Sequence, residues 1–255
     1  MTKNHTPYAL ITGASSGIGE QLAIQLAEQG YQLILVARRS DRLQALKAAI
    51  NAKHSIDIVV YPCDLLDVNA RALFLEETRK WDIKLVINNA GFGQVGVFNT
   101  LDLAKETEMI QLNIEALHVM TRWFAEHMDD GVILNVASMA GFIPTPLMAA
   151  YAATKAYVIN YSRAANYELI KAKKRLRILI LCPGPVDTEF AQVAGAKHAL
   201  KSISSRYCAR VAIKGIARRK TVIIPGFKMK LVHLFAKFIP TRWILAVSYR
   251  LQKLK

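Results

Sequence analysis

The sequence predicts an α/β fold in which a doubly wound, parallel, seven-stranded sheet carries helices on both faces. Short runs of apolar, often β-branched residues alternate with stretches whose apolar residues recur three and four positions apart. Several of the short runs, such as those at 33–37 and 85–87, are apolar throughout, which is typical of strands buried on both faces. Repeated strand–helix–strand units of this size build a parallel sheet.

Strands are expected at seven places along the chain, at residues 8–12, 32–37, 56–61, 84–88, 132–138, 177–182 and 221–224. The first helix follows the first strand, with Leu22, Leu26 and Ala27 on its apolar face and Gly30 at its end. Right-handed crossovers then place helices on both faces of the sheet. No linker or repeat interrupts residues 1–226, which we expect to form one domain, and residues 227–255 add two helical patterns broken at Pro240.

The composition is that of a globular protein. The chain has 255 residues, 53% hydrophobic and 21% charged, which excludes a disordered or collagen-like chain. Cys63, Cys182 and Cys208 form no CxxC pair, which favours reduced cytoplasmic thiols over disulfides or zinc. The first residues lack a signal-peptide core and no run of 18 apolar residues occurs, so we expect a cytoplasmic protein without a membrane span. The six histidines show no metal-ligand spacing, so no metal is expected.

The formal net charge of +15 is concentrated in the last quarter of the chain. All 19 acidic residues lie at or before Glu189, whereas 15 of the 34 basic residues follow it. The rest of the chain is therefore neutral overall, and the basicity points to a local property of residues 190–255.

A glycine-rich loop, TGASSGIG, directly follows the first expected strand and precedes a helix. Glycines let the backbone turn tightly and approach a pyrophosphate, and the helix N-terminus supplies free N–H donors. The loop therefore predicts a nucleotide site formed by Gly13, Ser15, Ser16, Gly17, Ile18 and Gly19. A plain turn is the alternative.

Further segments follow this loop in a characteristic order: NNAG at 88–91, Ser138, the Tyr151-x-x-x-Lys155 pair and Pro183-Gly184. In order and spacing the chain resembles the classical short-chain dehydrogenase/reductase family over about residues 6–190. The resemblance implies that residues 1–226 form a single-domain Rossmann fold that binds NAD(P) and carries the catalytic residues, with a variable substrate lid at 189–220. It also implies a homodimer or homotetramer, although the basic tail departs from members whose chain end builds the tetramer interface.

The residues after the second strand favour NADP(H) over NAD(H). A carboxylate near this point would hold the ribose hydroxyls of NAD, but residues 37–39 contain none. Arginine can instead pair with the 2′-phosphate of NADP. We therefore assign this role first to Arg38 and second to Arg39. The alternative for Arg39 is that it only begins the next helix on the surface.

The resemblance assigns further cofactor contacts. It places Asp64 and Leu65 beside the adenine ring and Asn89, Ala90 and Gly91 along the cofactor, while Asn88 is as well explained by a role in bracing the sheet. It places the loop after the sixth strand beside the nicotinamide, where it implies contacts from Pro183, Gly184, the Val186 backbone and the Thr188 hydroxyl. A purely structural turn is the alternative for this loop.

Tyr151 and Lys155 are four residues apart on a predicted helix and therefore share one face. A free tyrosine has a pKa of about 10, and a nearby ammonium and the positive nicotinamide ring favour the phenolate. The resemblance implies that Tyr151 donates the proton to a substrate carbonyl, that Lys155 grips the nicotinamide ribose, and that Ser138 binds the substrate oxygen. It implies that Asn113 helps to hold a water that relays protons to the lysine.

The tail 227–255 mixes large apolar residues with Lys and Arg, which predicts a basic amphipathic helical extension. Three interpretations stay open. The tail contacts an anionic membrane surface, it packs on the core or a partner subunit, or it binds an acidic ligand. Binding of nucleic acid is disfavoured. The protein would then be cytoplasmic, with peripheral membrane contact under the first interpretation.

The leading functional hypothesis is an NADP(H)-dependent oxidoreductase that moves a hydride between the nicotinamide and a ketone or secondary alcohol. Phe92, Phe142, Met148 and Phe190 flank the motif loops and suggest an apolar or lipid-like substrate, although core packing explains them almost as well. The alternatives are a non-catalytic NADP(H)-binding regulator and a membrane-surface interaction protein. Loss of Tyr151 or Lys155 would have favoured the regulator, but both residues are present.

Overall fold

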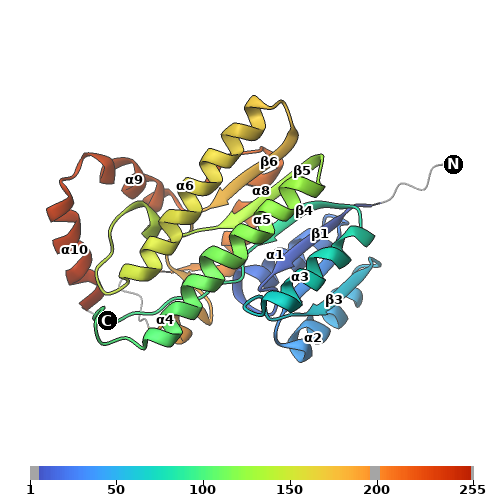
Figure 1. Ribbon diagram of the computed structural model, residues 1–255, viewed down its shortest axis with the longest axis horizontal. Coiled ribbons are helices and arrows are strands. Elements are labelled where there is room, and N and C mark those ends of the chain that lie inside the picture. The colour runs from blue at the N-terminus through green and yellow to red at the C-terminus, as the bar shows by residue number, and fades with distance from the viewer. Residues whose placement is uncertain (1–5, 196–201, 254–255) are drawn as a thin grey trace.

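The central sheet has seven parallel strands, which confirms the predicted fold class (Figure 1). The computed structural model describes residues 6–195 and 202–253. The strand order is β3 (Ile58–Pro62), β2 (Gln32–Ala37), β1 (Tyr8–Thr12), β4 (Ile83–Asn88), β5 (Asp130–Val136), β6 (Arg175–Leu181) and β9 (Val222–Ile223). The chain reverses its direction of travel across the sheet between β1 and β4. In a parallel sheet, ligands bind outside the carboxyl ends of the strands at such a switch point.

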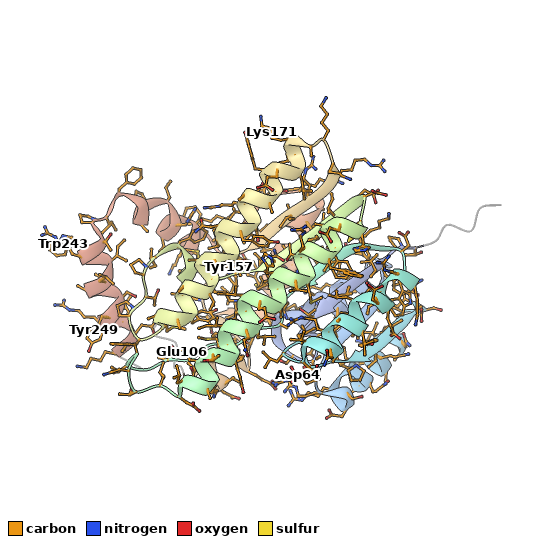
Figure 2. The ribbon with its side chains drawn as sticks, viewed as in Figure 1. Asp64, Glu106, Tyr157, Lys171, Trp243 and Tyr249 are labelled. Atoms are coloured by element: carbon orange, nitrogen blue, oxygen red, sulfur yellow. The ribbon has the colours of Figure 1, made fainter. Side chains whose placement is uncertain are left out.

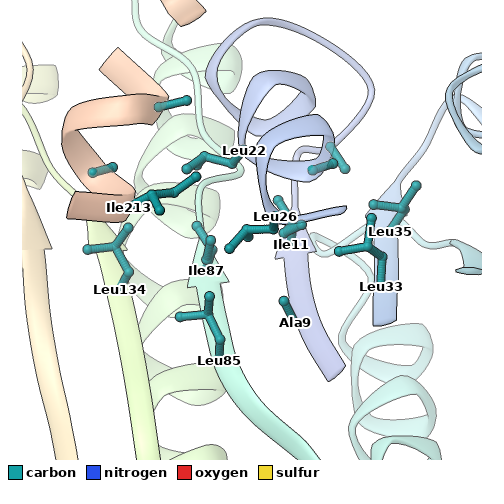
Figure 3. Close-up of a cluster of buried hydrophobic side chains, with 14 of the residues drawn as sticks. Ala9, Ile11, Leu22, Leu26, Leu33, Leu35, Leu85, Ile87, Leu134 and Ile213 are labelled. Atoms are coloured by element: carbon teal, nitrogen blue, oxygen red, sulfur yellow. The ribbon is translucent and has the colours of Figure 1, made fainter. Parts of the chain in front are cut away.

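Helices cover both faces of the sheet because alternate strand residues point to opposite sides. Ala9 and Ile11 of β1 belong to a buried cluster with α1 (Gly17–Ala27), α2 (Ser40–Asn51) and α8 (Ser205–Ala217), part of which Figure 3 shows. Leu10 belongs to the cluster on the other face, with α3 (Val68–Glu77) and α5 (Leu117–His127).

The second face also carries the long helix of the motif pair, α6 (Ala149–Lys171), whose Val158 and Ile159 pack in a third cluster. Next to it, α4 (Leu103–Ile110) runs into α5 through a π-helical turn, η2 (Gln111–Ala116). A short 3-10 helix, η1 (Thr78–Lys80), follows α3.

The fifth strand ends earlier than expected. It pairs through Val136, where a strand to residue 138 was predicted, and Ala137 still donates its N–H to Leu181 O at 2.8 Å. Ser138 then becomes the N-cap of a 3-10 turn, η3 (Met139–Phe142), because its Oγ accepts a hydrogen bond from Ala140 N at 3.2 Å. The expected third strand, at 56–61, is likewise shifted toward its C-terminal end.

The segment expected to be a lid, 189–220, divides into two parts. The first contains the short helix α7 (Phe190–Val193) and the strand β8 (Ile203–Ser204), which pairs with β7 (Val186–Asp187) just before the segment. The second is α8, whose Cys208, Ala209 and Ala212 are fully buried against the sheet, so this half belongs to the core. Lys197 and Lys201 of this segment lie outside the described residues.

The C-terminal extension forms two helices, α9 (Phe227–Phe235) and α10 (Thr241–Lys253), with a 3-10 turn, η4 (Ala236–Phe238), after α9. They stand at one end of the molecule, beyond the end of α6 and far from the N-terminus (Figure 1). Residues 254–255 of the predicted extension lie outside the described residues. In the described part of the chain, no helix is both long enough and apolar enough to cross a bilayer.

Candidate active site

A cavity of about 1100 Å³ lies at the carboxyl edge of the sheet. The structure brings nineteen of the sequence-predicted residues together in its lining. They are Gly13, Ser15, Ser16, Gly17, Ile18, Arg38, Arg39, Asp64, Leu65, Asn89, Ala90, Gly91, Ser138, Tyr151, Lys155, Pro183, Gly184, Val186 and Thr188. Two further predicted residues, Gly19 and Asn113, do not line it.

The glycine-rich loop is held by close backbone packing. Gly13 has a φ of +64°, and a Cβ there would lie 2.8 Å from Asn89 Nδ2. Asn89 Nδ2 in turn donates to Thr12 O at 3.0 Å and Gly13 O at 3.2 Å. A Cβ on Gly19 would lie 2.3 Å from Gly13 O. Gly19 therefore packs against the loop backbone on the side away from the cavity. The sequence had predicted a direct contact between Gly19 and the cofactor.

The N-terminus of α1 opens toward the cavity. Ser16 stands at the N-cap in extended conformation, and its side chain makes no capping hydrogen bond to the first turn. The first N–H groups of a helix have no partner within the helix, and with the helix dipole they favour an anion. Together with the space that the glycines leave, these donors fit the pyrophosphate of a dinucleotide.

Arg39 is fixed against this loop. Its guanidinium donates to Ser15 Oγ at 3.0 Å and to Ser16 Oγ at 3.0 Å, and it pairs with Glu189 at 2.9 Å. Arg38, with a side chain that is 70% exposed, only approaches Asp64, at 3.9 Å. Both arginines border the cavity, but Arg39 is the better anchored of the two.

Tyr151 and Lys155 project from α6 into the cavity and are both almost completely buried. Lys155 Nζ donates to Val136 O at 3.0 Å and lies 5.8 Å from the centroid of the Tyr151 ring. The Ser138 hydroxyl hydrogen-bonds the Tyr151 phenol. The strand end, the turn after it and the helix thus bring a phenol, an amine and a hydroxyl together.

Burial dominates the titration of this pair. It raises the pKa of Tyr151 to about 12, and the hydrogen bond from Ser138 opposes this change. It also lowers the pKa of Lys155 to about 8, with the Cys182 thiol acting in the opposite direction. Burial thus acts against the stabilisation of the phenolate that we expect from Lys155, whose Nζ lies 5.8 Å from the ring centroid, together with the nicotinamide ring.

Asn113 lies behind the cavity wall. It sits in the π-helical turn η2 and is fully buried. Its amide donates to Phe92 O at 2.9 Å and to Thr154 Oγ1 at 3.1 Å, and its Oδ1 accepts from Phe92 N at 3.2 Å. A Cβ on Gly91 would lie 2.6 Å from Asn113 Oδ1 and 3.5 Å from Lys155 Nζ. Asn113 thus positions the chain beside Lys155.

The far end of the cavity is built by the C-terminal helices, which sequence reasoning did not place there. Ten apolar residues of α9, α10 and the turn between them line it: Met229, Leu231, Val232, Phe235, Ala236, Ile239, Trp243, Ile244, Val247 and Leu251. The apolar periodicity of the tail is the signal that could have indicated such a wall.

A few contacts hold this wall in place. The Met229 side chain packs against Gly184, where a Cβ would lie 2.6 Å from its sulfur. The His233 and Phe142 rings lie with centroids 4.1 Å apart, and Gln252 Nε2 contacts Met148 Sδ at 3.3 Å. Figure 2 shows Trp243 and Tyr249 on α10 at the edge of the molecule, far from Asp64 on the nucleotide side. The cavity therefore runs from a polar nucleotide end to an apolar end.

Comparison with known proteins gives a consistent result. A family model described as short chain dehydrogenase matches residues 7–199. The Arabidopsis thaliana protein named "11-beta-hydroxysteroid dehydrogenase-like 3" is 32% identical, over 91% of this chain and 77% of its own length. A short-chain dehydrogenase from Sphingobium yanoikuyae in complex with NADPH has a TM-score of 0.81 and 31% identity, covering 97% of this chain and 94% of its own.

A second solved structure that matches this chain similarly well is the bulky-bulky ketone specific alcohol dehydrogenase from Comamonas testosteroni. Its TM-score is 0.78 at 28% identity, and the match covers 98% of this chain and 94% of that one. Both structural matches extend over the C-terminal helices as well as the central sheet. Within the described residues, no group of three His, Cys, Asp or Glu side chains is arranged to hold a metal ion.

Proposed function

This chain belongs to the short-chain dehydrogenase family, and from that premise we propose that it transfers a hydride between NADP(H) and a bulky, apolar ketone or secondary alcohol. It is an oxidoreductase that uses a nicotinamide dinucleotide. The observation that carries the finer proposal is one continuous cavity, lined at one end by the glycine-rich loop and Tyr151 and at the other by apolar side chains of α9 and α10.

Two features support NADP(H) as the cofactor. No carboxylate follows β2 at positions 37–39, where one would hold the ribose hydroxyls of NAD. Arg39 instead presents its guanidinium beside Ser15 and Ser16, and Arg38 stands next to it. Guanidinium and hydroxyl groups are suited to a phosphate, so this corner would hold the 2′-phosphate.

We infer a role for each reacting side chain from its place in the cavity. When bound, the nicotinamide supplies or accepts the hydride. The Tyr151 phenol, kept protonated by its raised pKa, donates its proton to the carbonyl oxygen in the reducing direction. The Ser138 hydroxyl, already on the phenol, hydrogen-bonds the same oxygen. Lys155 would hold the ribose hydroxyls, and its cationic form would favour the phenolate that remains.

The apolar wall supports a large hydrophobic substrate. Two of its lining residues, Val247 and Trp243, are 55% and 57% accessible, so a ligand that covers their apolar area would bind favourably. The names of the similar proteins, a hydroxysteroid dehydrogenase-like protein and a bulky-ketone alcohol dehydrogenase, point the same way. We infer a ketone with bulky groups on both sides of the carbonyl.

A panel of ketones tests this proposal. NADPH oxidation is followed at 340 nm with acetone, cyclohexanone and a steroid ketone, and NADH replaces NADPH in a parallel series. We expect turnover with the steroid ketone and NADPH, and little with acetone. Absence of turnover with every ketone, together with tight NADPH binding, would instead favour the non-catalytic regulator.

The outward face of α9 and α10 supports peripheral membrane contact. Five large side chains are exposed without lining the cavity, namely Phe227, Leu234, Phe238, Leu245 and Tyr249. Lys230, Arg242, Arg250 and Lys253 are exposed beside them, and no acidic residue follows Glu189. A surface of aromatic and cationic side chains without carboxylates is complementary to an anionic bilayer.

Vesicle co-sedimentation tests this contact. We expect the protein to pellet with vesicles containing phosphatidylserine, and Phe227→Ser with Phe238→Ser to reduce pelleting severalfold. Phe98→Ser is the matched control, because Phe98 is 73% exposed in a different part of the fold. Equal pelleting of all variants would refute the contact, and a concentration-dependent dimer lost in the double variant would assign the surface to a second copy.

A further inference from the structure

Glu189 connects the two walls of the nucleotide end of the cavity. It stands at the N-cap of α7, directly after Thr188, on the side formed by the segment after β6. Its carboxylate reaches across to Arg39, at 2.9 Å, and to Arg42, both of which follow β2 on the opposite side. Thr188 also approaches the loop, since a Cβ on Gly17 would lie 2.9 Å from Thr188 Cγ2. The first part of the lid is therefore fastened to the nucleotide side.

Arg39 is shared between two sets of partners. One set is the pair of loop hydroxyls, Ser15 and Ser16, and the other is the Glu189 carboxylate. All four residues line the cavity. The carboxylate is thus the anion that Arg39 already holds at the place where the 2′-phosphate of NADP(H) would need the same guanidinium.

The ion pair is suited to exchange. The side chains of Arg39 and Glu189 are 40% and 39% exposed, and exposed ion pairs contribute little to stability. The hydrogen bonds from Arg42 and Arg39 lower the pKa of Glu189 to about 2, so it is a full anion at neutral pH. Arg42 offers the carboxylate a second partner when Arg39 is taken by another anion.

We propose that Glu189 is a specificity-determining residue whose carboxylate competes with the cofactor 2′-phosphate for Arg39. This inference rests on the proposed role of Arg39 in binding NADP(H). NADP(H) exchanges the Arg39–Glu189 pair for an Arg39–phosphate pair and leaves the lid held through Arg42. NAD(H), which has a hydroxyl in place of the phosphate, leaves the Arg39–Glu189 pair intact. Glu189 thus weakens NADP(H) binding selectively.

A double-mutant cycle on cofactor binding tests the proposal. Dissociation constants for NADPH and NADH are measured by fluorescence titration for wild type, Glu189→Gln, Arg39→Gln and the double variant. We expect Glu189→Gln to tighten NADPH binding by about two- to fivefold, the range for one exposed ion pair, and to leave NADH unchanged. In the Arg39→Gln background the same substitution should have no effect on NADPH.

Other outcomes are decisive as well. Asp41→Asn is the matched control, because it also removes one negative charge, from the first turn of α2. It should change NADPH binding less than Glu189→Gln does. Equal weakening of NADPH and NADH by Glu189→Gln would make Glu189 a structural anchor only and overturn the inference. If Arg39→Gln leaves NADPH affinity unchanged, the assignment of Arg39 to the phosphate fails, whatever Glu189 does.

Discussion

Gly19→Ala should disturb the nucleotide site by displacing the backbone of the glycine-rich loop at Gly13. An added Cβ would meet Gly13 O at 2.3 Å, Asn89 Nδ2 at 2.7 Å and the Gly13 carbonyl carbon at 2.9 Å. A comfortable contact begins at roughly 3.4 Å, so the loop backbone has to move by about 1 Å. Overpacking of this kind costs about 1–3 kcal/mol. Each step of about 1.4 kcal/mol by which it weakens NADPH binding raises the dissociation constant tenfold.

The assay combines thermal unfolding with NADPH titration. We expect Gly19→Ala to lower the melting temperature and to weaken NADPH binding by about tenfold. Gly215→Ala is the control, because it also adds a methyl group to a helix at a crowded site, 2.4 Å from a side-chain carbon of Ile223, but away from the cavity. It should lower stability and leave NADPH affinity unchanged. Wild-type NADPH affinity in Gly19→Ala would refute the account of the loop.

Three further predictions concern the reacting groups and the wall. Burial lowers the pKa of Lys155 to about 8, so above that pH the unfolded chain binds more protons at Lys155 than the folded chain does. The free energy of unfolding of the wild type, measured relative to that of Lys155→Met by urea titration, should therefore rise by about 2 kcal/mol from pH 7.5 to 9.5. Asn113→Ala should lower kcat more than it weakens NADPH binding, since it removes three hydrogen bonds beside Lys155 without opening the nucleotide end; equal losses in both would contradict a positioning role. Val247→Ser with Leu251→Ser should raise KM for a steroid ketone severalfold and leave cyclohexanone kinetics unchanged, and unaltered steroid KM would show that the wall does not contact substrate.

Local patterns predicted most of the nucleotide end of the site. The loop after β1 and the Tyr151–Lys155 pair depend on residues close in sequence, and their geometry follows from a strand-to-helix turn and from helix periodicity. The parallel sheet then brings the strand ends to one edge. Ser138 was placed at a strand end, yet it lies two residues beyond β5, because Ser138 caps the turn η3 instead of extending the ladder.

The remaining features depend on contacts that periodicity does not specify. The amphipathic pattern of the tail gave each helix an apolar face, but not the partner of that face, so the wall on the cavity was not anticipated. The Arg39–Glu189 pair joins residues 150 positions apart, and no local signal connects them. The buried face of α8 likewise comes from its packing on α1, which only the folded chain shows.

The central claim is that Tyr151, set beside Lys155 and Ser138 at the nucleotide cavity, is the proton donor. Its most direct test is Tyr151→Phe, measured as kcat with NADPH and a steroid ketone alongside the NADPH dissociation constant. The account predicts a loss of at least about 100-fold in kcat, the contribution of a positioned acid, with NADPH affinity nearly unchanged. Wild-type turnover in this variant would contradict it.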